Sequence, residues 1–302
     1  MAAAVCLEAG CVSVASVKFD SAGIPELQMA AREPFASQEE RQIALDALVQ
    51  RHHLKKKRCT CVLSSNTYQL VQADMADLSI DERRDAARWQ IRERIDYPPE
   101  EAVIDLFDVA PFSSDKKPLT YVVSAQKSIL SERVDLFKAC DLNLETIDIP
   151  EFALRNICDL FTEDSRGLAI FLLLENSGLL VISRAGTLYL VRLFSAGMND
   201  LIPFADGDYE SLTDKLDAIV LEIQRSFDYC ESVFHLPLVS RLLVAQTVRD
   251  IPAMISYLNE YLAVSVEPFS LDGVLRLPEG TDPLQLNQNL LAIGGALRQE
   301  TH

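Results

Sequence analysis

The stretch AAVCLEAGCVSVASVKFDSAGIPELQMAA, residues 3–31, decides the fold because residues 168–194, LAIFLLLENSGLLVISRAGTLYLVRLF, repeat its pattern. Each copy consists of three apolar runs separated by two turns that contain glycine, which predicts three short strands. A Glu opens the first turn of each copy, at Glu8 and Glu175, and a Gly closes it. A helical pattern follows each trio. The repeat predicts a duplicated α/β fold with two lobes around a central cleft.

The composition indicates a globular protein with a large core and an acidic surface. The chain has 302 residues, 49% of them hydrophobic, and a formal net charge of −17 at pH 7. A charge of this sign argues against an extended nucleic-acid surface. No apolar run approaches the ~20 residues that cross a bilayer, and no basic stretch precedes an apolar one at the start. We therefore expect no membrane span and no signal peptide.

Cysteines and histidines occur in the sequence, but not at the spacings that are typical of metal sites or catalytic sites. The seven cysteines are an odd number and mostly stand among apolar neighbours, which predicts reduced, buried thiols in a cytosolic protein. Cys59 and Cys61 lack a second Cys or His pair, so we predict no metal site. The four histidines fit no catalytic spacing, and neither GxGxxG nor GxxxxGK[ST] is present. We predict no catalytic residue.

Helical and strand patterns alternate along both copies and suggest where the lobes divide. We assign residues 1–160 to the first lobe and residues 161–282 to the second. A helix at residues 283–298 is expected to return to the first lobe. The clearest helix is predicted over residues 209–234, where apolar residues recur at three- and four-residue steps.

A helix is also predicted over residues 79–95, opened by a capping box of Ser79 and Glu82. Its apolar stripe leaves out Trp89, the only tryptophan of the chain. Two interpretations of Trp89 stay open at this point. It packs under the following strand, or it faces a partner.

Four strings of the sequence resemble a known family over nearly the whole chain. They are IDYPPEEAVIDLFDVA (95–110), TIDIPEFALRNI (146–157), EIQRSFDYCES (222–232) and LAIGGALR (291–298). They are similar to PilM-like, actin-like proteins of type IV pilus assembly, and most of all to the MshI branch that serves MSHA pili. The cytoplasmic domain of the type II secretion protein GspL is a related architecture.

The resemblance implies a fold, a location and partners. The fold is actin-like and of the ribonuclease H type, with two lobes around a nucleotide cleft. Members are cytoplasmic and peripheral to the bacterial inner membrane. They dock the cytoplasmic tail of a bitopic, PilN-like inner-membrane protein, and they contribute to an assembly platform that works with the pilus motor ATPase.

The nucleotide site is where the sequence departs from this family. Relatives that bind nucleotide carry Asp in the first turn of each copy, whereas this chain has Glu8 in one and Leu172 and Leu174 before the other. No Gly-Gly pair follows the strand that ends near Ala245. The residues that remain for phosphate are Glu8, Gly10, Ser13, Lys18, Glu175, Ser177 and Gly178.

Leucine side chains fill space that phosphate and Mg²⁺ require, and an anion placed against them without donors costs several kcal/mol. We therefore expect ATP and Mg²⁺ binding, and with them hydrolysis, to be lost. The first hypothesis is a scaffold that is not an enzyme. The alternative is an ATP-binding switch with altered phosphate turns. A sugar or acyl kinase would need a catalytic Asp between the lobes, for which we find no candidate.

The partner tail is expected in a groove of the first lobe, beside the strands at residues 103–109 and 119–124. Main-chain pairing at a strand edge or side-chain pockets would supply the affinity. The acidic chain predicts a basic tail whose binding weakens with salt. The contact residues that we predict are Trp89, Val103, Leu106 and Val122.

Overall fold

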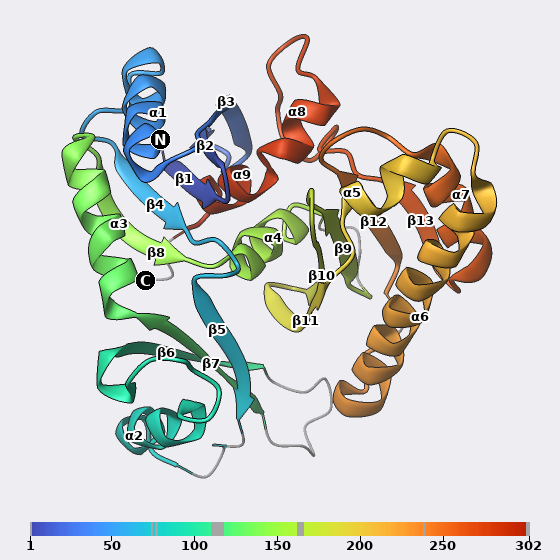
Figure 1. Cartoon of the computed structure of the whole chain (residues 1–302), viewed down its shortest axis with the longest axis horizontal. Coiled ribbons are helices and arrows are strands. Elements are labelled where there is room, and N and C mark those ends of the chain that lie inside the picture. The colour runs from blue at the N-terminus through green and yellow to red at the C-terminus, as the bar shows by residue number, and fades with distance from the viewer. Residues whose placement is uncertain are drawn as a thin grey trace.

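The computed structural model describes residues 2–73, 75, 78–109, 118–161, 166–237 and 239–299. Two five-stranded sheets of matching design dominate it (Figure 1). The first has the order β3-β2-β1-β4-β8 and the second β11-β10-β9-β12-β13. In each sheet the first three strands along the chain are antiparallel, and the remaining two run parallel to the first. The duplication predicted from the sequence is therefore confirmed at the level of sheet topology.

The strands begin and end close to the turns that the glycines predict. The first sheet contains β1 (Ala2–Glu8), β2 (Cys11–Phe19), β3 (Pro25–Pro34), β4 (Arg58–Val62) and β8 (Asn143–Asp148). The second contains β9 (Leu168–Leu173), β10 (Gly178–Arg184), β11 (Thr187–Phe194), β12 (Arg241–Gln246) and β13 (Ser265–Pro268).

Helices cover the outer face of each sheet with apolar stripes. On the first sheet these are α1 (Gln38–Arg51) and α3 (Lys127–Ala139), which share a core with β1, β2 and β4. On the second they are α6 (Tyr209–Phe234) and α7 (Pro252–Tyr261). The short helices α5 (Met198–Leu201) and η2 (Ile202–Phe204) precede α6. The observed α6 matches the predicted range 209–234.

Two helices fill the space between the sheets, α4 (Pro150–Cys158) and α9 (Leu290–Ala296). Their backbones touch: a Cβ added to Gly294 would lie 2.2 Å from the carbonyl oxygen of Ala153. The Asn156 amide also donates to the Gly294 carbonyl at 2.9 Å. Only glycine permits this approach, and it brings α9, from the end of the chain, onto β1, β2 and β4 of the first sheet.

The single helix predicted at residues 283–298 is instead two helices, α8 (Pro283–Gln288) and α9, which meet at Asn289. The Asn289 side chain donates to the carbonyl of Gln285 at 2.7 Å. The backbone of Asn289 has a φ of −108° and a ψ of 10°, which lie outside the helical range and account for the break.

A third, three-stranded sheet is inserted between β4 and α3. Its order is β5-β7-β6, with β5 (Tyr68–Ala73), β6 (Ala102–Val109) and β7 (Leu119–Gln126), all antiparallel. Helix α2 (Ile80–Ile91) covers one face, and η1 (Pro99–Glu101) leads into β6. The predicted capping box of Ser79 and Glu82 is present, although α2 ends at Ile91 and not at Ile95.

The expectations for the cysteines and for membrane-spanning helices can both be compared with the described residues. All seven cysteines are buried and none is in a disulfide, which confirms the prediction of buried thiols. None of the helices that the structure describes combines the length and apolar character needed to cross a membrane.

Candidate functional site

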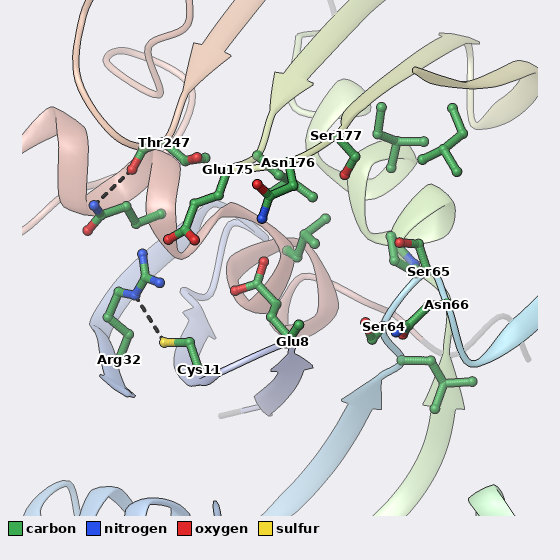
Figure 2. A pocket seen from close by; sticks show the side chains of 18 residues that line it. Glu8, Cys11, Arg32, Ser64, Ser65, Asn66, Glu175, Asn176, Ser177 and Thr247 are labelled. Atoms are coloured by element: carbon green, nitrogen blue, oxygen red, sulfur yellow. Dashed lines mark hydrogen bonds between the residues drawn. The ribbon is translucent and has the colours of Figure 1, made fainter. Parts of the chain in front are cut away.

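A cavity of about 220 Å³ opens between the two sheets, at the position where the sequence predicts a cleft (Figure 2). Its walls come from the matching first turns of the repeat. The β1–β2 turn supplies Glu8 and Cys11, and the β9–β10 turn supplies Glu175 and Ser177. The loop after β4, the start of α4, Thr247 and the α8–α9 region add further residues to the lining. The repeat thus brings two turns that are far apart in sequence to one site.

Two carboxylates point into this cavity, one from each turn (Figure 2). Burial raises the pKa of Glu8 from 4.5 to about 7; Arg32 opposes this shift and the negative charge of Glu175 adds to it. The guanidinium of Arg32 donates through Nε to the Cys11 thiol at 3.1 Å. The cavity therefore holds one carboxyl group from each turn beside the guanidinium of Arg32.

Apolar side chains form much of the remaining wall. Leu174, Leu193 and Leu291 all line the cavity, and Leu193 is 58% exposed at its rim. Leu172 does not line it, because its side chain is completely buried in the core between the sheets. Of the two leucines expected to fill phosphate space, Leu174 is therefore the one that lies in the site.

The segment that replaces the expected Gly-Gly turn, Gln246 and Thr247, is hydrogen-bonded to neighbouring parts of the chain. The amide and hydroxyl of Thr247 both donate to the Leu173 carbonyl, at 3.2 and 2.7 Å. The Gln246 side chain accepts from the amide of Ile251 at 2.9 Å. The carbonyl of Thr247 accepts from the Gln288 side chain at 2.8 Å. Because these donors and acceptors are hydrogen-bonded to one another, few of them remain to bind an adenosine.

The residues predicted for phosphate do not all meet at the cavity. Glu8, Glu175 and Ser177 line it, whereas Gly10, Ser13, Lys18 and Gly178 do not. Gly10 has a φ of +79°, so it is needed for the turn.

Of the four residues that do not line the cavity, three lie elsewhere in the fold. Ser13 is buried in β2, and Lys18 is exposed toward the far end of the same strand, opposite Glu26. A Cβ on Gly178 would lie 2.7 Å from the Phe171 ring, so this glycine serves packing. The prediction that Lys18 lies near the phosphate turn is wrong because β2 carries it away from that turn.

The four predicted partner residues do not form one surface. Val122 is completely buried, and Leu106 packs beside it in the core beneath α2. Val103 is 44% exposed and, since strand side chains alternate, it lies on the opposite face of the sheet from Leu106. Trp89 is 69% exposed on the outside of α2. The expectation of one docking surface is wrong because α2 covers one face of this sheet.

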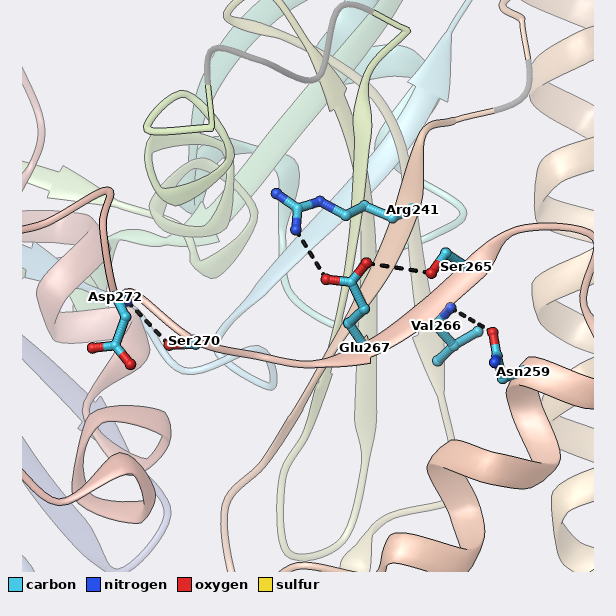
Figure 3. A network of polar contacts seen from close by, with 7 residues as sticks. All are labelled: Arg241, Asn259, Ser265, Val266, Glu267, Ser270 and Asp272. Carbon is cyan, nitrogen blue, oxygen red and sulfur yellow. Dashed lines mark hydrogen bonds and ion pairs between the residues drawn. The ribbon is translucent and has the colours of Figure 1, made fainter.

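A second cavity, of about 560 Å³, lies beside β12, β13 and the loop after β13. Two of its charged groups are paired: Arg241 donates to Glu267 at 3.0 Å, and Ser265 donates to the other oxygen of Glu267 at 3.3 Å (Figure 3). The Arg241 guanidinium also lies over the Phe161 ring, 5.4 Å from its centroid. These contacts hold the edge of the second sheet together.

Comparison with solved structures identifies the architecture. The structure titled PilM-PilN type IV pilus biogenesis complex matches 98% of this chain and 97% of its own, with a TM-score of 0.78 at 18% identity. A Bacteroides thetaiotaomicron protein of unknown function, described as having an actin-like ATPase fold, matches 96% of this chain and 95% of its own, with a TM-score of 0.52 at 8% identity. The chain has an actin-like ATPase fold.

A protein of a bacterial secretion system also matches this actin-like fold. The cytoplasmic domain of EpsL, an inner-membrane component of the Vibrio cholerae type II secretion system, matches 96% of this chain and 93% of its own, with a TM-score of 0.51 at 10% identity. No protein-family model matches the sequence. No curated protein matches it at a significant level either.

Proposed function

We propose that this protein is a non-catalytic scaffold in the inner-membrane assembly platform of a type IV pilus, and that it binds the cytoplasmic tail of a PilN-like bitopic membrane protein. The observation that carries the proposal is the match to a PilM–PilN complex over 98% of the chain, at a TM-score of 0.78. The match to the cytoplasmic domain of EpsL, an inner-membrane component, supports a position at the inner membrane as well. The MSHA type of pilus rests on the sequence strings alone, and the motor ATPase is a further proposed partner.

The cavity between the sheets supports a role without nucleotide chemistry. Its volume of about 220 Å³ falls below the ~300–1,000 Å³ usual for small-molecule sites. Glu175 and the ionised form of Glu8 would repel a polyphosphate, and the cation of the cavity, Arg32, lies beside Glu8 and already donates to Cys11. We therefore propose that the lobes serve as a rigid frame for protein contacts.

The tail site that we propose is the free edge of β6. In the sheet order β5-β7-β6, this strand pairs with β7 alone among the described strands. An extended peptide can add a strand at such an edge, with side-chain pockets supplying specificity. Val103 and Asp105 are exposed along β6, so an apolar and a basic residue of the tail, two positions apart, would complement them.

The test is calorimetric titration of the protein with a synthetic peptide of the partner's cytoplasmic tail. We expect binding that weakens as salt rises, because the chain is acidic. Val103→Arg places a cation at the proposed contact and should weaken binding by roughly tenfold or more. Ile43→Arg is the matched control, because Ile43 is 68% exposed on α1, away from β6. Equal affinities for the two variants would refute the β6 site, and no binding at all would refute the function.

The alternative of an ATP-binding switch has its own test, a thermal-shift titration with ATP and Mg²⁺. A ligand that binds only the folded state at about 100 times its Kd adds roughly 2.7 kcal/mol of stability. We expect no shift at millimolar ATP. A shift that Glu8→Ala abolishes and Lys18→Ala leaves intact would place nucleotide in the cavity and make the switch the better account.

A further inference from the structure

The cavity between the sheets contains charged groups of both signs that the fold does not pair. Its charged or titratable lining residues are Glu8, Cys11, Arg32 and Glu175. The two carboxyl groups are close enough for Glu175 to raise the pKa of Glu8. Neither carboxyl group has a hydrogen-bond or ion-pair partner among the described residues. Their acceptor oxygens are therefore available to a ligand.

Arg32 also has donors that the fold does not use. A guanidinium carries five N–H groups, and in Arg32 only Nε is hydrogen-bonded, to the Cys11 thiol at 3.1 Å. The two Nη groups find no acceptor among the described residues. Figure 2 shows this side chain directed into the cavity, as are Glu8 and Glu175. Two free Nη groups form a planar fork that matches the two oxygens of a carboxylate.

A ligand with one charge fits this set of groups poorly. An anion at Arg32 would lie in the field of the two carboxylates, and a cation at the carboxylates would lie in the field of Arg32. A small zwitterion meets both signs with the charge that each requires. An α-amino acid has this chemistry, since it carries a carboxylate and an ammonium group with three donors. The charges therefore favour an amino acid.

The remaining walls suit a small ligand with an apolar side chain. Leu174, Leu193 and Leu291 supply apolar surface to the cavity, whose volume is about 220 Å³. The hydroxyls of Ser64 and Ser177 also line it and have no hydrogen-bond partner among the described residues. Apolar walls with a few polar groups are typical of small-ligand sites.

We propose that this cavity binds a free α-amino acid with an apolar side chain. The ligand carboxylate accepts from the Nη groups of Arg32, and the ligand ammonium lies between Glu8 and Glu175. The side chain of the amino acid contacts Leu174 and Leu193. The site does not rest on the proposed scaffold function, and it adds a small-molecule ligand to that function.

The first test is a thermal-shift titration of the full chain with amino acids and with their separate charged parts. L-Leucine and L-methionine at millimolar concentration should raise the melting temperature, because they bind the folded state. Glycine should raise it less, since it lacks the apolar side chain. Acetate and methylammonium carry one charge each and should leave the melting temperature unchanged.

Variants then locate the ligand by calorimetric titration with L-leucine. Arg32→Gln and Glu175→Gln should each weaken binding about tenfold or more, because each removes a charge-assisted hydrogen bond. Arg84→Gln and Glu279→Gln are the matched controls; both residues are exposed outside the cavity, and affinity should stay within about twofold. Leu193→Ser changes a rim residue that is 58% exposed, so the fold should tolerate it, and it should reduce the preference for leucine over glycine.

The pH dependence of binding tests the part played by Glu8. Burial raises its pKa to about 7; Arg32 opposes this shift and Glu175 adds to it. An ammonium group prefers the ionised carboxylate, so leucine affinity should rise up to about tenfold from pH 6 to pH 8. Burial also raises the pKa of the Cys11 thiol, which stays neutral over this range, and Arg32 stays charged. Glu8→Gln should remove the pH dependence.

Several results would overturn the proposal. These are no shift with leucine or methionine, a shift of equal size with acetate or methylammonium, or an equal loss of affinity for Arg32→Gln and Arg84→Gln. An unchanged leucine preference in Leu193→Ser would contradict it even if Arg32→Gln failed to fold. Since tail affinity is measured separately and without amino acids, failure here leaves the proposed function standing, and the reverse also holds.

Discussion

At the scale of single residues, Glu8 lines the cavity and also affects the stability of the fold. Burial raises its pKa to about 7 from an ordinary 4.5, so the folded state holds its proton more tightly than the unfolded chain. For an acid shifted in this direction, stability is lost as pH rises through 4.5 to 7, because the unfolded state ionises first. Glu8 therefore costs stability at neutral pH, as residues at ligand sites often do.

Glu8→Gln removes that cost and should raise the free energy of unfolding by about 1–3 kcal/mol at pH 8. The gain should shrink at pH 5, where the folded-state carboxyl of the parent is protonated. Urea denaturation at the two pH values measures the difference. Glu279→Gln, in an exposed loop, is the control and should change little at either pH. A gain that is the same at both values would show that Glu8 is not the titrating group.

The cavity residues also show what a sequence can reveal about a site. Glu8 and Glu175 are found because they occupy equivalent places in the repeat, and the topology brings equivalent turns together. Arg32 and Leu193 were missed. Each reaches the cavity through strand pairing, Arg32 opposite Ser13 and Leu193 opposite Leu179. Register of this kind depends on distant residues and leaves no local signal.

At the scale of elements, periodicity predicted the individual strands and helices better than their grouping. The strands predicted at residues 103–109 and 119–124 are found as β6 and β7, yet the sequence does not reveal that β7 is the central strand, between β5 and β6. That arrangement decides which side chains are accessible. Val122 sits on the central strand beneath α2 and is buried, whereas Val103 on the edge strand is exposed.

Helix α2 shows the opposite case, in which a local pattern was informative. The off-stripe position of Trp89 left two interpretations, packing under a strand or facing a partner. Its 69% exposure excludes the first. The amphipathic pattern correctly separated the buried Ala87 and Ile91 from this residue, because helical geometry alone determines which face each side chain occupies.

At the scale of the whole molecule, the two sheets share a core. Side chains of β1 and β2 from the first sheet and of β9 and β10 from the second pack on α4 and α9 in one cluster. Helix α9 belongs to the end of the chain but packs on the first sheet. The division at residue 160 therefore remains a prediction about lobes, and we expect neither part to hold a complete core by itself.

This shared core predicts that the lobes unfold together. Calorimetry should give one transition whose van't Hoff and calorimetric enthalpies agree, although chains of this length often unfold in steps. Gly294→Ala tests the cause, because its Cβ would lie 2.2 Å from the Ala153 carbonyl and drive α9 off α4. We expect it to cost about 1–3 kcal/mol and to lower the melting temperature of both lobes in a single transition. If the variant instead melts in two steps, or if residues 1–160 fold alone, each lobe has its own core and α9 is only a bridge between them.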